Sequence, residues 1–80
     1  MIPREIRPRL NAVFQSVFDD SSIEIEDATT ASDIAQWDSL THINLILAIE
    51  RSFAVRFTTR EVRALKTVGD LIVLIQHKTP

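Results

Sequence analysis

The chain has 80 residues, which is room for one domain, and we predict a single domain over residues 1–80. Hydrophobic residues make up 45% of the chain and charged residues 25%, which is ordinary for a soluble globular protein. Cysteine is absent, which excludes a disulfide and a cysteine-based metal site, and His42 and His77 alone do not make a zinc site. We therefore expect no bound metal and a fold stabilised by helix packing.

No apolar run approaches the roughly 18 residues that a membrane span needs, and the N-terminus lacks the pattern of a secretory signal. We expect a cytoplasmic protein with no membrane span. Residues 19–38 hold seven acids and no base, whereas residues 51–66 hold five bases and one acid. With a net charge of −2 and only a modest basic cluster, the chain is not predicted to bind nucleic acid.

Apolar residues at helical spacing predict a first helix over residues 3–18. Pro3 suits a first helical turn, but Pro8 would remove a hydrogen bond inside the helix, so the helix could instead begin near Pro8. Residues 19–37 are rich in Asp, Ser and Thr and predict a long loop, because these side chains bond their own backbone. We expect isoleucines to attach this loop to the core: Ile23, Ile25 and Ile34.

A second helix is predicted over residues 39–53, with Asp38 as its N-cap. Its apolar residues form two stripes at about 100° per residue. The first stripe comprises Leu45, Ile46, Ile49 and Phe53, and the second comprises Leu40, Ile43 and Leu47. A small bundle cannot easily cover both, so the second stripe is predicted to contact something outside the domain.

Two further helices complete the predicted order. A short one is expected over residues 59–65, and the last one over residues 67–77. The segment Thr67-Val68-Gly69-Asp70 has the pattern of a capping box, with Asp in the place of the usual Glu. Few turn-forming residues occur in the chain, which argues against a β-rich fold.

Ser39 lies at the end of the acidic loop and at the start of an apolar helix. A helix N-terminus exposes unpaired N–H groups and a partial positive charge, so a phosphodiester attached there would be favoured. His42 follows three residues later on the same helix face, which raises the possibility of a nucleophile and a base. No oxyanion site or orienting group accompanies them, so no catalytic residue is predicted, and His42 is expected to be an exposed contact residue.

The whole chain resembles the acyl carrier protein family, and the resemblance is specific from Trp37 to Leu71. The matching residues are Asp38-Ser39-Leu40, Ile43, Leu45, Leu47, Ala48, Ile49-Glu50, Phe53, Phe57, Leu65 and Thr67-Val68-Gly69-Asp70-Leu71. The resemblance implies an all-α four-helix bundle of acyl-carrier type, with three longer helices, one short helix and a long loop between the first two. It implies a free-standing carrier and not an enzyme.

The resemblance also implies a site. Ser39 would receive 4′-phosphopantetheine from coenzyme A through a phosphopantetheinyl transferase, with Asp38 and Leu40 beside it. Acyl groups would then be carried as thioesters between acyl-loading and acyl-consuming enzymes. We expect a monomer that contacts its partners through Trp37, Leu40, His42, Ile43 and Leu47, although packing at the end of the loop is the preferred role for Trp37.

Two features depart from the family pattern. Gln36 occupies the position where the family commonly has Gly. The second helix is often strongly acidic in the family and meets basic patches on partner enzymes, but here it holds one acid, Glu50, followed by Arg51, and Asn44 stands where an acid is frequent. These departures argue against primary fatty acid synthesis and favour a specialised lipid, polyketide or other secondary pathway.

Two alternatives remain open. An aminoacyl or peptidyl carrier would share the fold, but such carriers resemble Gly-His-Ser or Gly-Gly-x-Ser around the serine, whereas this chain has Trp37-Asp38-Ser39. An unmodified helical interaction module would bind through the second helix and would keep its function when Ser39 becomes Ala. The cargo itself cannot be identified from the sequence.

Overall fold

The computed structural model describes residues 2–79, so positions 1 and 80 of the predicted domain lie outside the described residues. Within them the chain is all-α with no strand, as predicted. The elements are α1 (Pro3–Val17), the 3-10 turn η1 (Ala31–Asp33), α2 (Ser39–Phe53), α3 (Thr59–Ala64) and α4 (Val68–Lys78).

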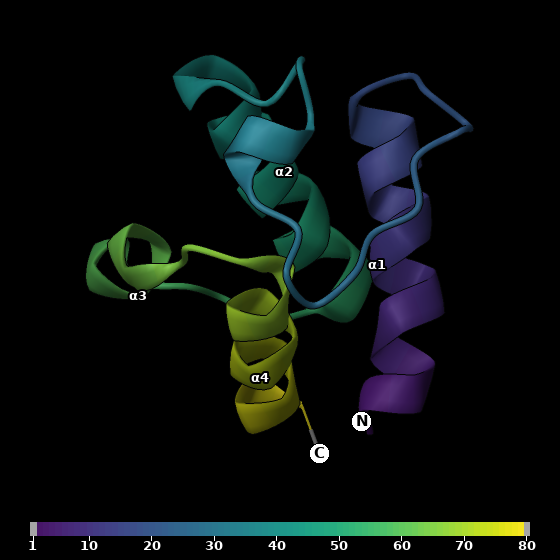
Figure 1. The fold of residues 1–80 in the computed structure, drawn as a ribbon. Coiled ribbons are helices and arrows are strands. Elements are labelled where there is room, and N and C mark those ends of the chain that lie inside the picture. The colour runs from purple at the N-terminus through teal and green to yellow at the C-terminus, as the bar shows by residue number, and fades with distance from the viewer. Residues whose placement is uncertain (1, 80) are drawn as a thin grey trace.

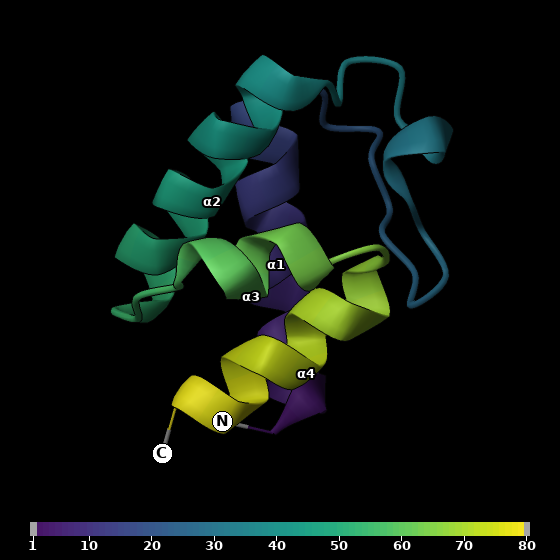
Figure 2. The same cartoon turned by 90° about the vertical axis from the view of Figure 1, so that its left-hand side faces the viewer.

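The helices form a small bundle in which α1 packs against both α2 and α4. The loop from residue 18 to residue 38 leaves the far end of α1, runs back along it and returns to the start of α2 (Figure 1). The short helix α3 lies between α2 and α4 at the side of the bundle (Figure 2). The start of α1 and the end of α4 lie at the same end of the molecule in both views.

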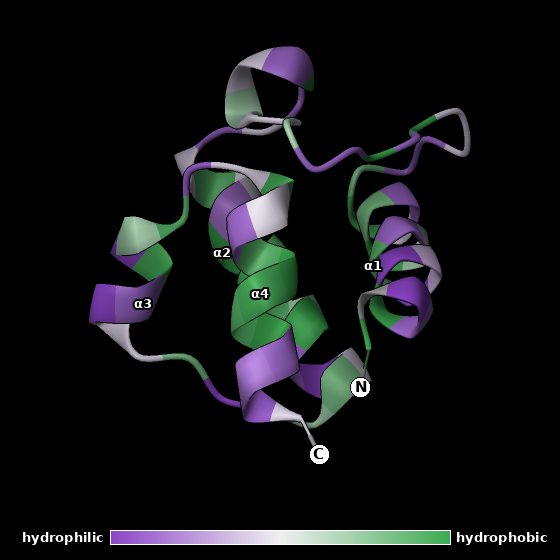
Figure 3. Ribbon diagram, turned by 60° about the horizontal axis from the view of Figure 1, so that its bottom comes forward, coloured by the Kyte–Doolittle hydropathy of each residue, from purple (hydrophilic) through white to green (hydrophobic). Residues whose placement is uncertain are grey.

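Four side chains, from α1 and its C-cap residue Phe18, form the centre of the core. Ile6, Leu10 and Phe14 have no exposed surface, and Phe18 is 7% exposed. They recur at spacings of four residues, which keeps them on one helix face. The core is completed by residues from the loop and the other helices, namely Ile25, Ile34, Leu45, Ile49, Phe53, Val55, Val68, Leu71, Ile72 and Ile75. Figure 3 shows the resulting pattern, with hydrophobic residues along α4 and alternating colours on α1.

Polar side chains of α1 hold the long loop in place. The amide of Asn11 donates to the carbonyl of Ile23 (3.2 Å) and accepts from the N–H of Ile25 (2.8 Å). Gln15 donates to the carbonyl of Ile23 as well (2.9 Å). Ile25 and Ile34 are buried and Ile23 is half-buried. The prediction that isoleucines attach the loop to the core is confirmed, and these amides satisfy backbone groups that have no partner in a regular element.

The start of α4 is fastened to the same loop. The N–H groups of Val68 and Gly69 donate to the carbonyls of Thr29 (2.9 Å) and Asp27 (2.8 Å). A Cβ on Gly69 would lie 3.0 Å from the carbonyl oxygen of Asp27, so the close approach of the two backbones favours glycine here. Arg7 of α1 forms an ion pair with Asp27 from the other side.

Side-chain caps determine where the later helices begin. Thr67 accepts from the N–H of Asp70 (3.1 Å), and Asp70 accepts from the N–H of Thr67 (3.2 Å), which confirms the predicted capping box. Thr58 and Glu61 form the same arrangement at the start of α3. α2 ends at Phe53, and its C-cap residue Ala54 has a φ of 55°, in the left-handed region that glycine usually occupies.

The remaining differences from the predicted elements are small. α1 begins at Pro3 and continues through Pro8, so the alternative start near Pro8 is wrong. Pro8 is exposed, and its helix is held by the buried stripe rather than by complete backbone hydrogen bonding. η1 was not predicted within the loop. α3 ends at Ala64, which releases Leu65 from the helix.

The capping box of α4 can be tested by substitution. Thr67→Ala removes the acceptor for the N–H of Asp70, and we expect the free energy of unfolding to fall by roughly 1 kcal/mol. Thr67→Ser retains the hydroxyl and should restore most of that loss. Urea denaturation of the three proteins measures the difference, and equal stabilities for Ala and Ser at this position would contradict a capping role.

Candidate functional site

Asp38 organises the first turn of α2. One of its carboxylate oxygens, Oδ1, accepts from the N–H groups of Leu40 and Thr41, each at 3.0 Å. The hydroxyl of Thr41 donates to the carbonyl of Gln36 (2.8 Å) and accepts from the N–H of Asp38 (2.8 Å). The hydrogen bonds from Thr41, and then the one from Leu40, lower the pKa of the Asp38 carboxyl. Asp38 is therefore the N-cap that the sequence predicted.

Ser39 is the first residue of α2 and is exposed. Within residues 2–79, its hydroxyl has no hydrogen-bond partner. Because the capping is done by Asp38 and Thr41, the Ser39 oxygen is left available for reaction at a fixed point of the backbone. The expected attraction of the helix N-terminus for a phosphodiester is reduced, however, since Asp38 already occupies the N–H groups of Leu40 and Thr41.

Trp37 packs against the core directly before this turn. Its ring meets Phe14 edge to face at 5.3 Å between centroids and lies 6.3 Å from Phe18. The preferred role of Trp37 in packing is thus confirmed. Trp37 is only half-buried, and it lines the same cleft as Ser39.

His42 lies one turn after Ser39 and stacks on Trp37, with ring centroids 5.9 Å apart and an angle of 19° between the planes. The indole Nε1–H of Trp37 donates to Nδ1 of His42 (3.0 Å). His42 is half-buried, and burial lowers its pKa. The expectation that His42 is exposed is therefore wrong. Its neutral form, with Nδ1 free to accept, fits the contact with Trp37.

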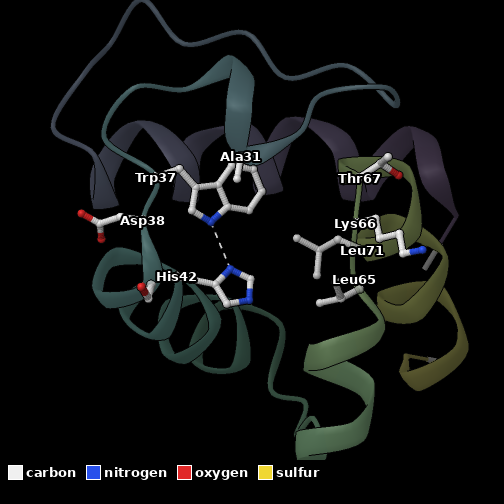
Figure 4. A pocket seen from close by; sticks show the side chains of 9 residues that line it. Ala31, Trp37, Asp38, His42, Leu65, Lys66, Thr67 and Leu71 are labelled. Carbon is white, nitrogen blue, oxygen red and sulfur yellow. Dashed lines mark hydrogen bonds between the residues drawn. The ribbon is translucent and has the colours of Figure 1, made fainter.

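A cleft of about 360 Å³ opens beside Ser39. The N-terminal turn of α2 forms one wall and the connection between α3 and α4 forms the other (Figure 4). Its lining residues are Ala31, Trp37, Asp38, Ser39, His42, Leu65, Lys66, Thr67 and Leu71. The structure thus brings together four predicted site residues and adds five that were not predicted as site residues. Leu65 reaches this wall because α3 has already ended at Ala64.

The three remaining predicted contact residues lie outside this cleft. Leu40, Ile43 and Leu47 have exposed fractions of 72%, 58% and 53%. The first stripe of α2 is buried, so the division of this helix into a buried stripe and an exposed stripe is confirmed. A shallower groove of about 240 Å³ between α2 and α3 includes Ile43 and Leu47 in its lining.

The described part of the chain has neither a metal-ion cluster nor a membrane-spanning helix. Among residues 2–79, no three His, Cys, Asp or Glu side chains gather closely enough to hold a metal ion. Within the same residues, no helix combines the length and the hydropathy that crossing a membrane would require.

The contact between Trp37 and His42 predicts a pH response. The folded-state pKa of His42 lies below its usual value of 6.5, so folding favours the neutral ring. The stability that this contributes is present above pH 6.5, and it is lost as the pH falls from 6.5 through the lower folded-state pKa. Protonation of Nδ1 also removes the acceptor of the indole N–H. We expect the indole N–H resonance of Trp37 to shift along a curve with a midpoint below 6.5, and His42→Phe to abolish that shift. A midpoint at or above 6.5 would contradict the burial of His42.

Comparison with known proteins gives a curated relative and a solved structure with the same description. No protein-family model matches the chain. The chain is similar to a curated acyl carrier protein of Acidothermus cellulolyticus, with 31% identity over 94% of this chain and 89% of that protein.

A solved structure agrees with this relative. The fold is similar to the solution structure of holo acyl carrier protein from Geobacter metallireducens, with a TM-score of 0.82 and 41% identity over 95% of this chain and 83% of that one. A relative of this identity and coverage shares both fold and family. The four-helix architecture, the capped turn at Ser39 and these two similarities together show that the chain belongs to the acyl carrier protein family, whose members are carriers and not enzymes.

Proposed function

We propose that Ser39 is the attachment site of 4′-phosphopantetheine and that the chain carries acyl groups on that arm. The observation that supports this most directly is the state of the Ser39 hydroxyl. It is exposed, has no hydrogen-bond partner within residues 2–79, and belongs to the first residue of a helix capped by its neighbour Asp38. An attacking group can reach the oxygen without breaking any of the bonds that hold the turn.

The surrounding residues fit such a group. The arm supplies a terminal thiol on which acyl groups are held as thioesters. Asp38 holds the turn in place, and Trp37 gives the adjacent cleft a rigid wall because it is packed on Phe14. Leu65 and Leu71 provide an apolar wall on the opposite side, and Lys66 contributes a positive charge to a rim on which Asp38 is negative. These residues orient whatever is attached at Ser39 and shield one side of it from water.

The partners that follow from this function are a phosphopantetheinyl transferase, acyl-loading enzymes and acyl-consuming enzymes. Leu40, Ile43 and Leu47 are proposed as the surface that these enzymes contact, because an exposed apolar stripe beside the attachment site marks a binding surface. A specialised cytoplasmic pathway is proposed rather than primary fatty acid synthesis. Its support is the charge of α2, in which the only carboxylate, Glu50, accepts from the N–H of Phe57 (2.8 Å).

Attachment at Ser39 is tested by intact-mass analysis. The chain is incubated with coenzyme A and a broad-specificity phosphopantetheinyl transferase. We expect a gain of one phosphopantetheine on the natural chain and none on Ser39→Ala. Asp38→Asn, which keeps an acceptor at the cap, should still be modified if Asp38 acts through the turn.

The proposal would be contradicted if the chain is folded by circular dichroism but gains no mass, both with this transferase and with a transferase from its own pathway. That result would favour an unmodified interaction module. Modification of Ser39→Ala would show that another residue is the attachment site.

The proposed pathway has a separate test. The holo chain is supplied to fatty acid synthase enzymes in competition with a carrier whose second helix is acidic. We expect this chain to be elongated at least tenfold more slowly, since an interface lacking its complementary charges loses association rate. Elongation at a comparable rate would contradict a specialised pathway.

A further inference from the structure

The exposed stripe of α2 has a basic border. Arg51 follows Leu47 by four residues, which places it on the same helix face. Across the groove between α2 and α3, Thr59 and Val62 line the α3 side, and Arg63 follows Thr59 by four residues. Arg51 and Arg63 are exposed.

Two carboxylates in the same region, Glu50 and Glu61, have hydrogen-bond partners within the chain. Glu50 accepts from the N–H of Phe57 (2.8 Å). Glu61 accepts from the N–H of Thr58 (2.8 Å) and pairs with Lys78 of α4 (3.0 Å), on the side of α3 that faces away from α2. Glu50 is the only carboxylate among the residues that line the groove, and one of its two oxygens already accepts the hydrogen bond from Phe57.

The arginines of this region are free by contrast. Within residues 2–79, no ion pair involves Arg51, Arg56, Arg60 or Arg63. All four are exposed, and Arg56 precedes Phe57 of the groove lining. An apolar stripe bordered by four unpaired arginines, with Glu50 as the only carboxylate in the lining of its groove, is complementary to a surface of negative charge.

We infer that the face formed by Leu40, Ile43, Leu47, Arg51, Arg56 and Arg63 docks a protein that presents an apolar socket surrounded by carboxylates. The identification of that protein as an acyl-transferring enzyme rests on the proposed function, whereas the charge of its docking surface does not. Its socket would receive Leu47 and Ile43, and its carboxylates would pair with the arginines. Basic docking patches would be repelled by this face.

The inference is tested on the unmodified chain labelled with ¹⁵N. Two helical peptides serve as probes, identical in a stripe of Leu and Phe and differing only in flanking residues, which are Glu in one and Lys in the other. We expect the Glu peptide to bind with a Kd about eightfold lower, because each of three exposed ion pairs contributes a factor of about two. Amide shifts should map to α2 and α3, and salt near 1 M should remove the difference between the peptides.

Substitutions separate charge from apolar contact. Arg63→Glu should abolish most of the preference for the Glu peptide, and Leu47→Ala should weaken both peptides. The matched control is Arg4→Glu, which makes the same change of charge at an exposed position of α1. Arg4 shares a helix face with Arg7 and Asn11, whose side chains contact the long loop. This control should leave the preference unchanged.

Equal binding of the two peptides, or shifts outside α2 and α3, would overturn the inference. A dimer in sedimentation equilibrium that is lost in Arg63→Glu would also overturn the inference. The face would then bind the acidic loop of a second copy of the chain. None of these measurements requires modification of Ser39, so failure of phosphopantetheine attachment is recorded separately by intact mass.

Discussion

The edge-to-face contact between Phe14 and Trp37 joins the core of the bundle to the turn that bears Ser39. Phe14 belongs to the buried stripe of α1, on which both α2 and α4 are packed. Trp37 ends the long loop, and Asp38 follows at once as the cap of α2. The position of Ser39 is therefore set by aromatic packing on one side and by backbone hydrogen bonds on the other. Such double support gives an exposed side chain a fixed location without burying it.

α2 contributes both to the core and to an exposed surface, because apolar residues cover most of its circumference. Leu45, Ile46 and Ile49 are buried in the bundle, whereas Leu40 and Leu47 remain exposed. A chain of 80 residues cannot supply enough further structure to cover both stripes. The uncovered stripe runs along the helix from the turn of Ser39 toward α3, so a partner that contacts it also approaches the proposed attachment site.

Periodicity and capping predicted the helices and the division of α2, because both depend on side chains close together in the sequence. The contact of Trp37 with His42 was not predicted, and the helical pattern alone gave His42 an exposed position. His42 is half-buried where it stacks on Trp37, and Trp37 is in turn held by Phe14 of α1 and by Phe18, the C-cap residue of that helix, a contact between residues far apart in the sequence. Leu65 joined the cleft for a similar reason, since its location depends on where α3 ends.

Trp37 couples the stability of the bundle to the occupancy of the cleft through thermodynamic linkage. The same ring is packed against the core and borders the cleft beside Ser39. A group that rests on the exposed edge of this ring interacts with the folded chain and has no equivalent in the unfolded one. Occupancy of the cleft and stability of the bundle are then coupled reciprocally, so that a carrier with its cleft filled resists unfolding and proteolysis better than an empty one.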